Sequence, residues 1–114
     1  MSIDIVIPPM PRGDPGGMRE LAGICRSSAG QIGSLGDNVT ALPKSMTFEG
    51  RAATAFGDRM QTFGSQLADA ASELQDAARR LESAAAEVER LIAEREAAIQ
   101  RAAELQAQTV QAGL

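Results

Sequence analysis

The sequence predicts an all-α protein, an antiparallel helix-turn-helix hairpin whose second helix is longer than the first. The strong helix formers Ala, Leu, Glu, Gln and Arg dominate the chain after Gly50. Apolar residues recur at alternating spacings of three and four over two long stretches, which is typical of helices packed as in coiled coils. Residues 43–50, which contain proline and glycine, separate the two stretches and predict a short turn between antiparallel neighbours.

Residues 1–13 are predicted to form an extended or flexible N-terminal arm. Ile3, Ile5 and Ile7 alternate with other residues, and the prolines that follow favour an extended path. Two interpretations are open. The arm is either a flexible tail, as chain termini often are, or a segment that docks along the helices or in a partner's groove.

Helix one is predicted to span about residues 14–42. Asp14 suits the N-cap and Pro15 the first helical position, where no N–H is needed. Pro43 is expected to end the helix, because proline disfavours helical geometry at the residue before it. We expect Cys25 to be a small buried apolar residue. The apolar stripe of this helix comprises Met18, Leu21, Cys25, Ser28, Ile32, Leu35, Val39 and Leu42.

Helix two is predicted to span about residues 51–108, and residues 109–114 form a C-terminal tail. Its apolar stripe comprises Phe56, Met60, Phe63, Leu67, Ala70, Leu74, Ala77, Leu81, Ala84, Val88, Leu91, Arg95, Ala98, Ala102 and Leu105. Arg95 is the one residue of the stripe that is not apolar. It either pairs with a partner's carboxylate and fixes the register, or lies exposed beyond the packed region.

Folding the chain at the turn brings the two apolar stripes together in one register. The expected pairs are Val39 with Phe56, Leu35 with Met60, Ile32 with Phe63, Cys25 with Ala70, Leu21 with Leu74 and Met18 with Ala77. A small-residue stripe runs beside each apolar stripe, formed by Ala22, Ala29 and Gly36 on helix one and by Gly57, Gly64, Ala71, Ala78 and Ala85 on helix two. Small residues on matching sides allow the two backbones to approach closely.

Half of helix two is expected to extend beyond helix one and to need a partner. Its predicted partner interface comprises Leu81, Val88, Leu91, Ile92, Ile99 and Leu105. Burying each of these side chains is worth about 1.5–3 kcal/mol, so their exposure in a single hairpin is unfavourable. A second copy or another helical hairpin would complete a four-helix bundle, as a homodimer or a heterodimer.

The composition argues against catalysis and against several classes of partner. The chain has no His and one Cys, so we expect no catalytic residues, no metal site and no cofactor, and the protein is predicted not to be an enzyme. A net charge of −4 disfavours nucleic acid. We also expect no membrane span, no cleaved signal peptide and no small-molecule substrate.

The turn carries a short motif. Phe48, Glu49 and Gly50 are followed by Ala52, Ala53 and Phe56. Gly50 allows backbone angles that are closed to other residues, and Phe48 either caps the core or also contributes to a surface cleft. In this motif, the hairpin plan and the chain length, the sequence resembles the WXG-motif family of type VII (ESX) secretion systems, with Phe48 in place of the tryptophan.

The resemblance implies a secretion substrate, or the non-signal dimer partner of one, that acts by helix–helix association. It implies synthesis in the bacterial cytoplasm and a secreted or cell-envelope location, with the secretion machinery as a further partner. Many family members or their partners carry a Tyr-x-x-x-Asp/Glu signal after the second helix, whereas this chain has no Tyr. A partner then supplies the signal, or the chain is not itself targeted. Two alternatives stay open: a structural coiled-coil adaptor with no secretion role, and a stand-alone domain of the type that precedes toxins.

Overall fold

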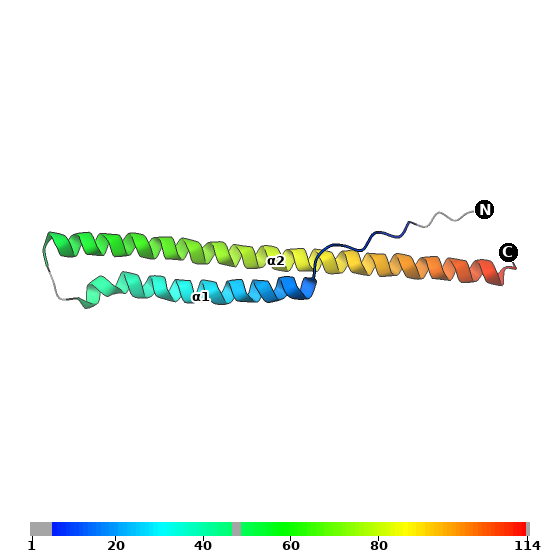
Figure 1. Ribbon diagram of the computed structural model, residues 1–114, viewed down its shortest axis with the longest axis horizontal. Coiled ribbons are helices and arrows are strands. Elements are labelled where there is room, and N and C mark those ends of the chain that lie inside the picture. The colour runs from blue at the N-terminus through cyan, green and yellow to red at the C-terminus, as the bar shows by residue number, and fades with distance from the viewer. Residues whose placement is uncertain (1–5, 47–48, 114) are drawn as a thin grey trace.

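Two antiparallel helices make up the structure (Figure 1). The computed structural model describes residues 6–46 and 49–113. Helix α1 spans Pro15–Ser45 and α2 spans Arg51–Gln111, and together they form a rod of 95 × 17 × 12 Å. The predicted all-helical hairpin with a longer second helix is therefore confirmed.

Helix α1 begins as predicted but ends later. Asp14 is the N-cap, and its carbonyl oxygen accepts a hydrogen bond from the Met18 N–H at 2.9 Å. The helix continues through Pro43 to Ser45, so the predicted end at residue 42 was three residues early. Pro43 removes one backbone hydrogen bond and its ring crowds the preceding turn, but it lies close enough to the end of α1 for the last turn to be completed around it. The Met46 N–H donates to the Pro43 carbonyl oxygen, and the Ser45 hydroxyl donates to the carbonyl of the residue before Pro43.

Helix α2 begins at a glycine with unusual backbone angles. Gly50 is the N-cap residue with φ of +102°, a conformation that favours glycine, as the sequence predicted. Its carbonyl oxygen accepts a hydrogen bond from the Thr54 N–H at 3.1 Å. The helix then runs for 61 residues, three residues further than predicted. Neither helix of the described chain is long and apolar enough to cross a membrane.

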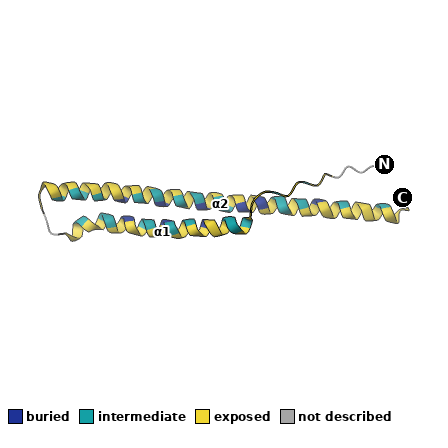
Figure 2. Cartoon of the chain, viewed as in Figure 1, coloured by how far each residue is buried: buried dark blue, intermediate teal, exposed yellow. Residues whose placement is uncertain are grey.

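The centre of the helix pair is built from alanine and glycine. The buried residues between the helices are Ala22, Ala29 and Gly36 on α1 and Gly64, Ala71, Ala78 and Ala85 on α2. The predicted small-residue stripes are thus the contact itself rather than its edge, while the two apolar stripes lie to one side of it. No large side chain among the described residues is fully buried, and exposed positions cover most of both helices (Figure 2).

The predicted register of the two helices is wrong by one heptad, or about 10 Å along the axis. A β-carbon built on Gly36 would lie 3.4 Å from the Leu67 Cβ, whereas Met60, one heptad earlier, was expected at this level. A groove between the helices is lined by Leu21 and Cys25 from α1 and by Ala77 and Leu81 from α2. The two α2 residues again lie one heptad beyond the predicted partners. The prediction assumed a compact turn, but α2 begins well beyond the end of α1 (Figure 1).

Candidate association surface

The helix pair has two unlike faces, one on each side of the small-residue stripes. Because an α-helix has 3.6 residues per turn, residues three and four positions after a stripe residue lie on opposite sides of it. Cys25 and Arg26 follow Ala22 in this way, and Leu81 and Glu82 occupy the same positions after Ala78. One face of the pair is therefore apolar, and the other carries charge. We call them the apolar face and the ion-pair face.

The ion-pair face joins α1 to α2 through two salt bridges. The Arg26 guanidinium donates two hydrogen bonds to the Glu82 carboxylate, and Arg19 Nη2 lies 3.0 Å from Glu89 Oε1. All four side chains are about half exposed, so each bridge contributes about 0.2–1 kcal/mol. Sequence reasoning missed these bridges. The seven-residue spacing shared by the two arginines and the two glutamates was the signal that could have found them.

The apolar face remains open to solvent in the single chain. Leu21 and Leu35 are both 49% exposed, and Phe63 on α2 is exposed as well. The groove lined by Leu21 and Leu81 lies on this face, with Glu73, Asp76 and Arg80 among its other lining residues. Cys25 also lines it and is half-buried rather than fully buried as predicted. A continuous apolar strip with a charged edge is therefore available to another helix.

The turn-motif residues have different environments. Phe48 lies outside the described residues. Gly50 is exposed at the start of α2, and Phe56 is half-buried in the second turn of that helix. Together with the exposed Phe63, this means that the described aromatic side chains are not fully buried core residues within the single chain.

The predicted partner-interface residues lie in three environments. Leu81 is half-buried beside α1, and Val88 is 7% exposed where α1 begins. Leu91 and Ile92 are half-buried, and the more distal interface residues, Ile99 and Leu105, are exposed. The part of α2 beyond α1 comprises residues 89–111, about 35 Å, and we call it the overhang. It is shorter than predicted, because the one-heptad shift places more of α2 beside α1.

Arg95 lies on the apolar stripe of the overhang and is half-buried. Its Nε is buried and has no hydrogen-bond partner among the described residues. Burial of an unsatisfied N–H is unfavourable, so this position suits a hydrogen-bond acceptor supplied from outside the described chain.

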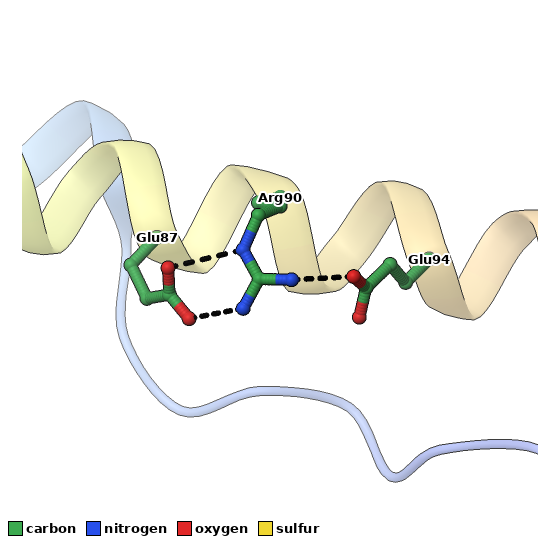
Figure 3. Close-up of polar contacts among 3 residues, drawn as sticks. All are labelled: Glu87, Arg90 and Glu94. Carbon is green, nitrogen blue, oxygen red and sulfur yellow. Dashed lines mark hydrogen bonds and ion pairs between the residues drawn. The ribbon is translucent and has the colours of Figure 1, made fainter.

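A charged cluster borders the same part of α2 (Figure 3). Arg90 Nε donates to Glu87 Oε2 at 3.1 Å, and the same guanidinium also contacts Glu94. The hydrogen bond from Arg90 lowers the pKa of Glu87, and the two carboxylates raise the pKa of Arg90. All three side chains are more than half exposed, so the cluster is a solvated edge of the helix.

No protein-family model, curated protein or solved structure matches this chain. Among the described residues, no group of three or more His, Cys, Asp or Glu side chains is placed to hold a metal ion. The most distinctive surface of residues 6–46 and 49–113 is therefore the apolar face and its continuation along the overhang.

Proposed function

We propose that this protein is an association module of a type VII (ESX-like) secretion system, either a substrate or the non-signal partner of one. It acts by binding rather than by catalysis. Its apolar face packs against a second helical hairpin, from another copy or a related chain, to form a four-helix bundle. The proposal includes synthesis in the bacterial cytoplasm and export without a cleaved signal peptide.

The observation that carries the proposal is the one-sided exposure of large apolar side chains. The contact within the hairpin buries alanine and glycine, which remove little apolar surface from water. Leu21, Leu35, Leu42 and Phe63 remain exposed on the same face. A two-helix hairpin with so small a core is marginal alone, whereas covering this face would bury several large side chains. The link to secretion rests on the Phe48–Gly50 motif and the hairpin plan.

The first experiment measures association by size-exclusion chromatography with light scattering. The wild-type chain should be a dimer or larger species, and Leu35→Glu should shift it toward monomer. Gln61→Glu is the matched control, because Gln61 lines a groove with Asp37 and Thr40 on the ion-pair face, opposite the apolar face. A monomeric wild type, or equal effects of the two substitutions, would contradict self-association through the apolar face.

The second experiment addresses secretion. An epitope-tagged chain should appear in the culture medium of the native bacterium and disappear from it when the type VII ATPase is deleted. A pull-down from the same cells should recover a second helical hairpin that carries the missing tyrosine signal. If the chain associates but is never exported, the adaptor function replaces the secretion function.

A further inference from the structure

Residues 6–13, which we call the arm, extend along the overhang (Figure 1). The chain turns at Gly13, whose φ is +119°, and α1 begins two residues later. A β-carbon built on Gly13 would lie 3.5 Å from Val88 Cγ2, so the arm starts in contact with α2. Figures 1 and 3 both show it continuing parallel to α2, in the direction away from α1.

The alanines of the overhang show which side the arm covers. Ala98, on the apolar stripe, is 5% exposed, whereas Ala93, Ala97 and Ala103 are exposed on the same helix. Because the side chains are identical, the difference in their exposed fractions indicates that another segment covers one side of the helix. Helix α1 ends its contact near Val88, and within the described chain the arm is the other segment beside the overhang. The arm therefore covers the apolar stripe as far as Ala98, whereas Leu105, further along the stripe, is exposed.

The spacing of the arm's prolines fits this placement. Pro8 and Pro11 are half-buried, whereas Val6 is 85% exposed. A polyproline-type strand repeats every three residues, so these two prolines share one side. From Gly13 to Pro8 such a strand advances about 16 Å at about 3.1 Å per residue. An α-helix covers that length in about ten residues at about 1.5 Å each, which is the interval from Val88 to Ala98.

The fit of the arm is incomplete at one point. Arg95 lies between Val88 and Ala98 on the covered stripe, and its buried Nε has no hydrogen-bond partner among the described residues. The arm thus covers a polar group without satisfying it. A helix that brought a carboxylate to this position would satisfy the Nε–H and cover the stripe as well.

We propose that the arm is a displaceable strap. In the free chain it occupies the apolar stripe of the overhang, and a partner helix competes with it for that stripe. The stripe continues the open apolar face beside α1, so a long partner helix can use the whole of α2 only when the arm has left. The competition between the arm and a partner helix rests on the proposed association function. The occupancy of the stripe by the arm does not depend on that function.

Spin-label distance measurements test the occupancy. Labels are attached to Met10→Cys and Ala97→Cys in a Cys25→Ser background, because both labelled positions are exposed. A docked arm gives one narrow distance distribution, and Pro8→Ser/Pro11→Ser broadens it. Val6→Ser is the matched control and leaves it narrow. A broad distribution in the unsubstituted arm would overturn the strap.

Sedimentation of the same unlabelled variants tests the competition, with a second copy as the competing helix. Pro8→Ser/Pro11→Ser should tighten self-association at least threefold, and Val6→Ser should leave it unchanged. The competition would be overturned if the unsubstituted arm gives a narrow distance distribution but Pro8→Ser/Pro11→Ser leaves self-association unchanged. The arm would then still occupy the stripe. If no variant self-associates, two claims are overturned: competition by a second copy, and self-pairing through the apolar face. The distance measurement still decides where the arm lies.

Discussion

Gly36 and Gly64 face each other across the helix pair, and their backbones come too close for larger residues. A β-carbon on Gly64 would lie 3.3 Å from the Gly36 carbonyl oxygen and 2.6 Å from Thr40 Cγ2. Thr40 cannot rotate away freely, because its hydroxyl donates a hydrogen bond to the Gly36 carbonyl oxygen at 2.8 Å. Among the glycines between the helices, Gly64 leaves the least room for a β-carbon.

We therefore expect Gly64→Ala to destabilise the hairpin. Overpacking costs about 1–3 kcal/mol, and the better helix propensity of alanine offsets about 1 kcal/mol, so the net loss should be about 1 kcal/mol. Urea denaturation followed by circular dichroism, at one protein concentration, measures it. Gly23→Ala is the control, because nothing lies within 4 Å of its β-position, and it should stabilise the chain. Adding Thr40→Ser, which removes the clashing methyl, should restore part of the loss.

The register can be tested with the single native cysteine. Cys25 and Ala77 line the same groove, so a short bifunctional thiol reagent should join Cys25 to Ala77→Cys within one chain. The same reagent should join Cys25 to Ala70→Cys far less, because that residue lies one heptad, or about 10 Å, further along the axis. Mass spectrometry of the monomeric product measures both yields. Preferential crosslinking of the Ala70 variant would restore the register predicted from the sequence.

Arg26 and Glu82 should be energetically coupled through their salt bridge. Arg26→Glu places two like charges together and should lower the free energy of unfolding by about 1 kcal/mol, and adding Glu82→Arg should recover most of it. The loss should shrink in high salt, since both side chains are half exposed. A double-mutant cycle by urea denaturation gives the coupling. Additive effects of the two substitutions would mean that the bridge contributes nothing in solution.

Acid should weaken the cluster at the edge of the overhang. The pKa of Glu87 is lowered in the folded chain by its hydrogen bond from Arg90. The resulting stability is present above the pKa of an unfolded glutamate and is lost as the pH falls through the lowered folded value. Arg90→Gln should raise the pKa of Glu87 toward that of an unpaired glutamate, as carboxyl NMR titration measures. An unchanged titration in that variant would show that the contact does not form in solution.

The heptad spacing was enough to predict two helices, their antiparallel order and a small-residue stripe on each of them. It could not distinguish registers that differ by one heptad, because Leu74 and Leu81 present the same pattern to Leu21. It also placed the apolar stripes at the centre, where large side chains usually lie in coiled coils. In this chain glycine and alanine allow a closer approach, so the leucines move to one side. The register depends on where α2 begins relative to the end of α1 (Figure 1), and the heptad spacing carries no measure of that.

The narrow cross-section of the rod has a consequence for transport through a confined space. The rod is two helices wide beside α1 and carries one helix and the arm along the overhang, so its girth does not grow along its 95 Å length. An α-helix with its side chains is about 10–12 Å across, so an opening of about 20–24 Å admits the two helices of the folded hairpin end-on. Passage of one hairpin would then require alignment with the channel axis rather than loss of helical structure.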